Sequence, residues 1–183
     1  VLQKRHIEIE DLLEDNACAE ALARQEGPAI QLACESIRFM DEMPGGFLVY
    51  YANGDEEVIY ANRALLRIFQ CATMQEFREY TGNSFQGMVY PEDLELVEQS
   101  IRNQIASSQY DLDYVEYRIC RKDGALRWIE DYGHFVRNRE GRDFFYVFLG
   151  DATEKRQQAM LEMATLLQEK EQNEQKLQNI IKE

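Results

Sequence analysis

The sequence predicts an α+β domain in which a five-stranded antiparallel sheet carries short helices on one face, with N-terminal helices and a C-terminal coiled-coil helix added. Two short strand-like runs separated by Asn53-Gly54-Asp55 precede several helical segments. Three longer strand-like runs follow in succession, and Asp123-Gly124 separates the first two. Asn-Gly and Asp-Gly favour hairpin turns, so neighbouring strands should be antiparallel. Strands and helices grouped in this way are typical of α+β folds.

The N-terminal part is predicted to be helical. In residues 2–25, large apolar side chains are interspersed among Glu, Asp and Ala, a composition that favours a helix. Gly27-Pro28 then interrupts this segment. Proline suits the first turn of a helix, so a second helix should begin at Pro28. Its apolar residues recur at helical spacing to about Met43, and Pro44-Gly45-Gly46 should end it.

The first hairpin and two helices come next. Phe47–Tyr51 and Val58–Tyr60 are rich in aromatic and β-branched residues, which favour strands. Asn62 is well suited to cap a helix over Arg63–Gln70, which has an apolar face. A short helix is expected over Thr73–Glu79.

A longer helix and three strands complete the predicted core. Pro91 should start the helix, which extends to about Ser107 and has acidic residues in its first turn, where the helix dipole favours them. The strands are expected over residues 111–121, 126–137 and 143–151. We therefore divide the chain into a helical linker (1–34), a folded domain (35–152) and a C-terminal helix (153–183).

The C-terminal helix contains two apolar stripes of equal quality. Residues 152–183 contain neither proline nor glycine. One heptad register comprises Met160, Met163, Leu167, Lys170, Glu174, Leu177 and Ile181, and the other comprises Ala159, Met163, Leu166, Lys170, Asn173, Leu177 and Ile180. We expect a parallel coiled coil, because no other segment is predicted to cover these stripes. A solvated amphipathic helix is the alternative.

Composition excludes several classes of partner. The formal net charge is −14 and no basic patch stands out, which argues against binding to nucleic acid or to an anionic membrane. No apolar run has the length of a membrane span, and no signal peptide is recognisable. The four cysteines have no metal-binding spacing, so we expect reduced thiols and a cytoplasmic location. Val1 is not an initiator methionine, which suggests a piece of a longer protein.

Several motifs, in their order and spacing, resemble a PAS domain of the bacterial subtype called PAS_3. Tyr90-Pro91-Glu92-Asp93 is similar to the His-Pro-Asp-Asp motif before the long helix, with Tyr in place of His. Glu116-Tyr117-Arg118 and Arg127-Trp128-Ile129 resemble the strand pair of that subtype. Asp151-Ala152-Thr153-Glu154-Lys155-Arg156 resembles the Asp-Ile-Thr-Glu-Arg-Lys exit motif. The resemblance covers about residues 36–156 and implies a sensory domain.

The sequence offers little for cofactor chemistry or catalysis. Haem binding in this family needs an axial histidine near the long helix, whereas the two histidines are His6 and His134. A flavin-binding light sensor would carry a cysteine before that helix, and Cys71 lies too early in the chain. No nucleophile, base and acid occur in a recognisable arrangement. We expect no resident cofactor, no metal and no enzymatic activity in this chain, although an unidentified small molecule remains possible.

The resemblance places a candidate pocket between the sheet and the short helices. The plausible wall residues are Leu65, Phe69, Phe85, Met88, Tyr117, Ile119 and Trp128. These side chains could instead fill the space as core. The exit motif suggests a joint made by Asp151, Thr153 and Arg156, where Asp151 could cap the helix or hold an arginine.

Three functional hypotheses follow. The first is a sensory and dimerisation module, forming a homodimer through its flanking helices and covalently linked to an output domain. The family suggests a histidine kinase as that output, with a diguanylate cyclase or phosphodiesterase as the alternative. The second is a small-molecule enzyme, which the missing catalytic residues disfavour. The third is a structural spacer that only dimerises. It differs from the first because no ligand or partner would shift its equilibrium between two conformational states.

Overall fold

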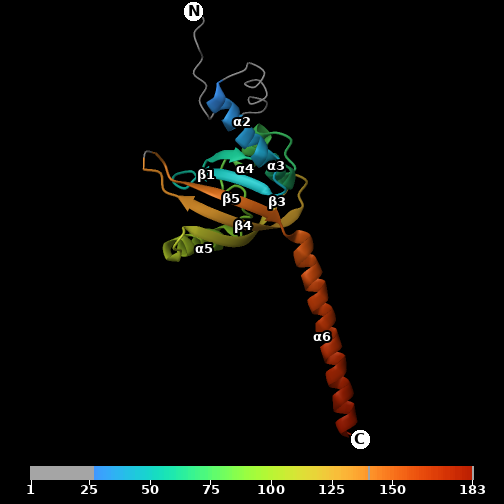
Figure 1. Ribbon diagram of the computed structural model, residues 1–183. Coiled ribbons are helices and arrows are strands. Elements are labelled where there is room, and N and C mark those ends of the chain that lie inside the picture. The colour runs from blue at the N-terminus through green and yellow to red at the C-terminus, as the bar shows by residue number, and fades with distance from the viewer. Residues whose placement is uncertain (1–26, 140, 183) are drawn as a thin grey trace, which may run out of the picture. The chain divides into compact units, whose positions relative to one another are not determined.

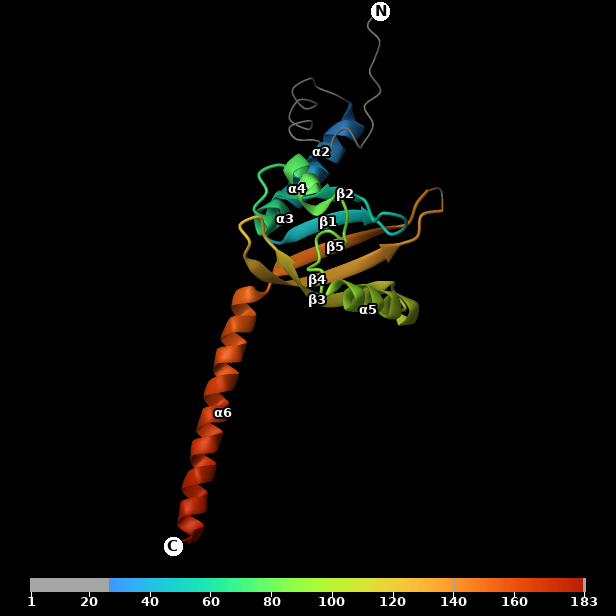
Figure 2. The same cartoon turned by 180° about the vertical axis from the view of Figure 1, so that it is seen from behind.

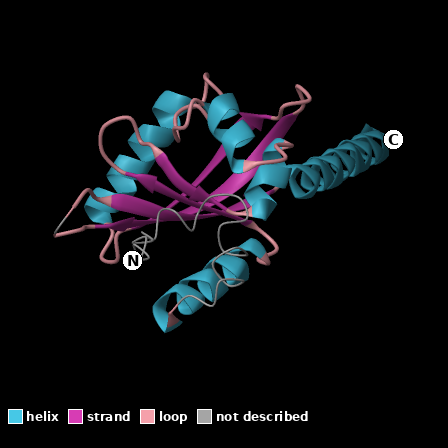
Figure 3. Ribbon diagram, turned by 90° about the horizontal axis from the view of Figure 1, so that it is seen from above, coloured by secondary structure: helices cyan, strands magenta, loops and turns pink. Residues whose placement is uncertain are grey.

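The computed structural model describes residues 27–139 and 141–182, and the side chains of residues 27–139 and 141–179. The helix predicted over residues 2–25 lies outside the described residues, as do Cys18 and His6. Helices pack against a central sheet (Figures 1 and 3). The described residues up to Asp151 form one compact unit, and those from Ala152 onward form a second.

The sheet has five antiparallel strands, as the sequence predicts, and their order is β2-β1-β5-β4-β3. The strands are β1 (Gly46–Tyr51), β2 (Val58–Ala61), β3 (Leu112–Cys120), β4 (Leu126–Val136) and β5 (Phe144–Asp151). The last strand pairs with the first, which brings the two ends of the domain side by side at the centre of the sheet. The helices between β2 and β3 make the crossover from one edge of the sheet to the other.

Among the described residues, four helices belong to the same unit as the sheet. They are α2 (Pro28–Asp41), α3 (Arg63–Phe69), α4 (Met74–Thr81) and α5 (Leu94–Ser107). Alternate strand residues face α3, α4 and α5 and form one continuous hydrophobic core with them. Figure 2 shows α5 running beside β3.

Side-chain caps fix the starts of α3 and α4, and the cap by Asn62 was predicted. Oδ1 of Asn62 accepts hydrogen bonds from the backbone amides of Leu65 (3.0 Å) and Phe47 (2.9 Å). Nδ2 of Asn62 donates to the carbonyl oxygen of Met40 (2.7 Å), and this bond ties the end of α2 to the domain. Thr73 caps α4 by accepting from the amide of Glu76.

The long helix begins at Leu94 and not at Pro91, which corrects the expected start. Residues 91–93 form a turn in which the amide of Asp93 donates to the carbonyl oxygen of Tyr90. The carboxylate of Asp93 does not cap the helix, because the guanidinium of Arg118 holds both of its oxygens, at 2.6 and 3.0 Å. The ring of Tyr90 lies 4.5 Å from the same guanidinium.

The second unit is the single helix α6 (Thr153–Lys182). Its large apolar side chains are exposed, and they include Met160, Leu161, Met163, Leu166, Leu167 and Leu177. Among the described residues, no helix combines the length and the apolar character that a membrane crossing requires.

Candidate ligand pocket

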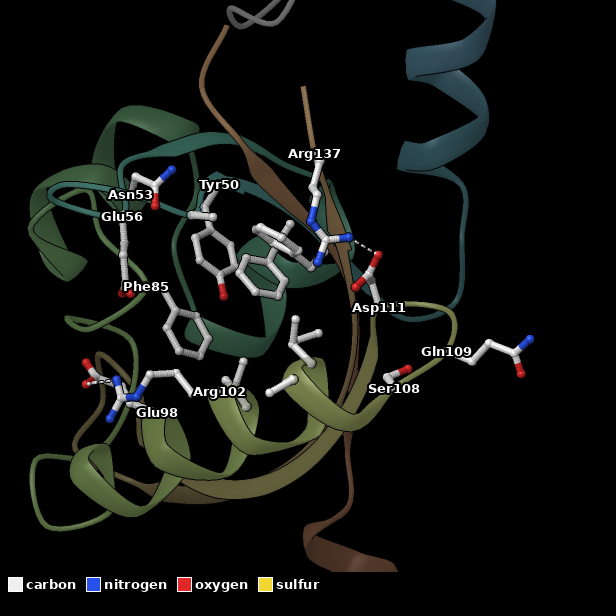
Figure 4. A pocket seen from close by; sticks show the side chains of 16 residues that line it. Tyr50, Asn53, Glu56, Phe85, Glu98, Arg102, Ser108, Gln109, Asp111 and Arg137 are labelled. Atoms are coloured by element: carbon white, nitrogen blue, oxygen red, sulfur yellow. Dashed lines mark hydrogen bonds and ion pairs between the residues drawn. The ribbon is translucent and has the colours of Figure 1, made fainter. Parts of the chain in front are cut away.

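A pocket of about 720 Å³ opens between the sheet, α5 and the loop that joins β1 to β2 (Figure 4). Its volume lies in the range of small-molecule sites in proteins. The apolar lining consists of Tyr50, Ala52, Phe85, Ile101, Ile105, Ala106, Phe135 and Phe145. The polar lining consists of Asn53, Glu56, Glu98, Arg102, Ser108, Gln109, Asp111 and Arg137.

The aromatic wall of the pocket follows from strand register. Tyr50 on β1 pairs with Phe145 on β5, and Phe145 pairs with Phe135 on β4. Since directly opposite residues share a face of the sheet, the three rings form one row. The ring of Tyr50 stacks on those of Phe145 (5.1 Å) and Phe85 (4.8 Å), which holds it in place.

The β1–β2 loop brings an acid to this aromatic row. Glu56 adopts a positive φ of 52°, and its carbonyl oxygen accepts from the amide of Phe85. One carboxylate oxygen of Glu56 is buried without a hydrogen-bond partner. Burial raises the pKa of Glu56 to about 7, and the nearby charge of Glu98 adds to this effect.

Two ion pairs lie at the pocket. Arg102 contacts Glu98 at 3.2 Å one turn earlier on α5. Arg137, at the end of β4, pairs with Asp111 just before β3 (Figure 4). Both arginines are thus already engaged by carboxylates.

A layer of buried acids lies on the same face of the sheet. The hydroxyl of Tyr117 donates to Oδ2 of Asp131 at 2.8 Å. Asp113 packs over Gly133, where an added Cβ would lie only 2.3 Å from Oδ1 of Asp113. That oxygen is buried and has no hydrogen-bond partner. Glycine at position 133 therefore makes room for a carboxyl group within the core.

Comparison with known proteins identifies the fold. The PAS_3 family model, described as a PAS fold, matches residues 58–148. The folded unit is a PAS domain. No match was found among curated proteins.

Solved structures share the PAS fold at low sequence identity. The structure of an RNA-binding Light-Oxygen-Voltage receptor is 22% identical with a TM-score of 0.54; the match covers 79% of this chain but only 40% of that one. A PAS domain from a two-component sensor histidine kinase is 16% identical with a TM-score of 0.53, covering 67% of this chain and 98% of that one. A PAS domain of an HTR-like protein from Haloarcula marismortui is 20% identical with a TM-score of 0.53, and the match covers 70% of this chain and 98% of that one.

The PAS domain places the predicted wall residues in three environments. Phe85 lines the pocket. The side chains of Leu65, Phe69, Met88, Tyr117 and Ile119 are fully buried in the core, so the filled-core alternative applies to them. Trp128 lies on the outer face of β4, because its neighbour Ile129 is buried on the inner face. This corrects the expectation that Trp128 faces the pocket.

Sequence reasoning missed most of the pocket. It did not single out Tyr50, although alternation along β1 could have placed Tyr50 inside with Leu48. It also missed Glu56, whose position depends on a loop conformation without a clear sequence signal. The α5 residues belong to a predicted helix, but the side of the helix that faces the pocket depends on the packing of the whole domain.

The histidine and cysteine considered for cofactors lie away from the pocket lining. His134 is exposed on the outer face of β4, on the opposite side of the sheet from Phe135. Cys71 is buried just after α3, and burial raises the pKa of its thiol. Within the described part of the chain, no group of three or more His, Cys, Asp or Glu residues is arranged to hold a metal ion.

The predicted exit joint spans the boundary between the two units. Asp151 is the last residue of β5 and is exposed, whereas Thr153 is the first residue of α6 and is buried. Arg156 lies in the first turn, and its amide donates to the carbonyl oxygen of Ala152. The signalling role of these residues stays a prediction.

Proposed function

We propose that this PAS domain is the sensory and dimerisation module of a larger signal-transduction protein. A ligand or an upstream segment would change the conformation of the PAS domain, and α6 would carry this conformational change to a covalently linked output domain. The observation that carries the proposal is a PAS domain with an open, partly charged pocket, followed after one residue by a 30-residue helix with exposed apolar side chains. The module itself would be sensory and not catalytic.

We favour a histidine kinase as the output domain. Two of the solved structures with this fold belong to histidine kinases by their titles, and one of these comes from Burkholderia thailandensis E264. A diguanylate cyclase or phosphodiesterase is the alternative output.

We further propose a parallel homodimer through the flanking helices. Met160, Met163 and Leu167 of α6 are 72, 60 and 54% exposed, and they follow one another at heptad spacing. An isolated helix with such a stripe is only marginally stable in water, and pairing with a second copy would bury the stripe. Lys170–Glu174 and other charged residues would lie at the same seam or beside it.

Filling the pocket in the full-length protein tests the sensory role. Ala106 is exposed on α5 and lines the pocket, so Ala106→Trp should occupy its entrance with little effect on folding. Ser107→Trp places the same bulk one residue further along the same helix, at a position that does not line the pocket. We expect Ala106→Trp to hold the output activity at one level while Ser107→Trp remains responsive. If both variants respond as the parent does, the domain is a spacer and the sensory proposal fails.

A further inference from the structure

The phenol of Tyr50 ends inside the pocket without a hydrogen-bond partner. Tyr50 is only 3% exposed, and its ring is held between neighbouring aromatic rings. Its hydroxyl makes no hydrogen bond to any described residue, and Figure 4 shows it pointing into the pocket. The hydroxyl is therefore a polar group at the pocket that is available to a ligand.

Four carboxyl groups act electrostatically on this hydroxyl, and two of them, Glu56 and Glu98, line the pocket. Burial raises the pKa of Tyr50 most, and the charges of Asp131, Glu56, Asp113 and Glu98 raise it further. Only Glu98 has an arginine partner, namely Arg102. Asp131 receives the hydroxyl of Tyr117, whereas Asp113 and Glu56 each have a buried oxygen without a partner. Asp131 and Asp113 do not line the pocket, so Glu56 is the one acid of its described lining without an ion-pair partner.

The positive groups that line the pocket form their ion pairs with other acids, although the charge of Arg102 also acts on Glu56. Arg102 and Arg137 line the pocket, but each is already paired with its own carboxylate, Glu98 or Asp111. An anionic ligand would have to break one of these pairs and approach Glu56. A cationic ligand would find an unpartnered carboxyl group beside aromatic rings, and aromatic faces also attract cations.

We infer that the pocket selects a small organic cation, an ammonium group on an apolar body, with Glu56 and Tyr50 receiving the ammonium. The inference rests on the proposed sensory function and names the chemical class of its ligand. The ammonium donates to the carboxylate of Glu56 and to the phenol oxygen of Tyr50. The apolar body packs against Phe85, Phe135 and Phe145, the rings that line the same pocket.

Three probes that share one body test this selectivity. Phenethylammonium, phenethyl alcohol and hydrocinnamate carry a positive, a neutral and a negative group on the same phenylethyl frame. Calorimetric titration of the chain at neutral pH should show the ammonium binding at least about tenfold more tightly than either of the others, since a charge-assisted hydrogen bond supplies that factor.

Two variants and one control locate the binding group. Glu56→Gln should weaken phenethylammonium binding by about tenfold or more, and Tyr50→Phe should weaken it less because the ring remains. Asp55→Asn removes the same charge from an exposed neighbour that does not line the pocket. It should leave the affinity unchanged. Should Glu56→Gln prove unfolded, Tyr50→Phe still decides whether the ammonium binds at this site.

Proton release gives an independent readout. Glu56 is partly protonated at neutral pH, since its pKa is about 7, and a bound cation should ionise it. The heat of phenethylammonium binding should therefore differ between phosphate and Tris buffers, which take up the proton with different enthalpies. The difference should disappear in Glu56→Gln.

The outcomes separate this inference from the proposed function. If phenethyl alcohol or hydrocinnamate binds as tightly as the ammonium, the pocket is a ligand site but the cation preference is wrong. If none of the three binds at millimolar concentration, the inference also fails. The sensory proposal then still stands as long as Ala106→Trp, and not Ser107→Trp, fixes the output of the full-length protein.

Discussion

The hydroxyl of Tyr117 donates a 2.8 Å hydrogen bond to the carboxyl group of Asp131 in the interior of the PAS domain. Tyr117 is 0% exposed and Asp131 is 1% exposed. Burial raises the pKa of Asp131 to about 8; the bond from Tyr117 opposes the shift, and the charge of Asp113 adds to it. Burial likewise raises the pKa of Asp113 to about 6. The folded domain thus holds protons that the unfolded chain releases near pH 4.

The first prediction concerns the pH dependence of stability. Folded-state pKa values above the ordinary Asp value of 3.8 mean that the folded state binds more protons than the unfolded state. The free energy of unfolding should therefore fall as the pH rises from about 4 to about 8, by on the order of a few kcal/mol. Urea denaturation at a series of pH values measures this slope.

The matched variant for this prediction is Asp131→Asn. This substitution removes the carboxyl group with the higher pKa and keeps an acceptor for the hydroxyl of Tyr117. The free energy of unfolding should therefore fall less steeply as the pH rises. Asp55→Asn removes an exposed charge and should leave the slope as it is. A parent protein whose stability rises between pH 4 and 8 would contradict the assignment of Asp131 as a protonated core residue.

The second prediction concerns Asn62. This side chain is 0% exposed and makes four hydrogen bonds, to Phe47, Leu65, Met40 and Gly45. Asn62→Ala should lower the free energy of unfolding by about 2–4 kcal/mol, because it removes a helix cap and leaves buried backbone groups unpaired. Thr73→Ala removes only a cap, at the start of α4, and should cost about 1 kcal/mol. Equal losses in the two variants would show that the bonds from Asn62 to Met40, Gly45 and Phe47 contribute nothing.

The third prediction concerns Arg118. The hydrogen bonds from Arg118 lower the pKa of Asp93, and Glu92 lies 3.1 Å from the same guanidinium. Lysine keeps the charge but cannot hold two carboxylate oxygens in one plane. Arg118→Lys should therefore destabilise the domain by about 1–2 kcal/mol. Arg38→Lys, in an exposed pair with Glu42 on α2, should change stability by less than about 0.5 kcal/mol.

The sequence predicted the sheet well because its signals are local. Asn53-Gly54 and Asp123-Gly124 separate strands that pair as expected, and Asn62 and Thr73 cap the helices that follow them. The start of α5 was misplaced because the carboxylate of Asp93 binds Arg118, a residue distant in sequence. A local rule for acidic residues in the first turn of a helix cannot anticipate a competing tertiary contact.

The pocket was harder to predict for a related physical reason. Its aromatic row depends on which residues of β1, β4 and β5 lie directly opposite one another, and this register is a tertiary property. Hydrophobicity alone marked residues such as Leu65 and Phe69, which fill the core. The acid that distinguishes the site, Glu56, looks like an ordinary surface residue in the sequence.

The fourth prediction tests the coiled coil proposed for α6. Leu177 belongs to both heptad registers, so Leu177→Glu should shift light scattering of the chain from dimer towards monomer. Leu167→Glu and Leu166→Glu each disrupt one register only, and the more harmful of the two identifies the register in use. Gln168→Glu adds the same charge outside both stripes and serves as the control. A monomeric parent at micromolar concentration would refute the dimer.

The last prediction concerns Asp151, where β5 ends one residue before α6 begins. We expect Asp151→Ala to leave the fold intact, because the residue is exposed and the loss of a cap costs on the order of 1 kcal/mol. The melting temperature of the isolated chain should then change by only a few degrees.

The same energy is large for a balance between two states of nearly equal free energy, since about 1.4 kcal/mol changes their ratio tenfold. The two equivalent heptad registers of α6 supply such a balance in the sequence. In the full-length protein, Asp151→Ala should therefore hold the output at a fixed level while the domain stays folded. Glu154→Gln changes one charge in the first turn of α6 and should preserve the response. If Asp151→Ala responds to its stimulus as the parent does, the joint between sheet and helix does not depend on this carboxylate.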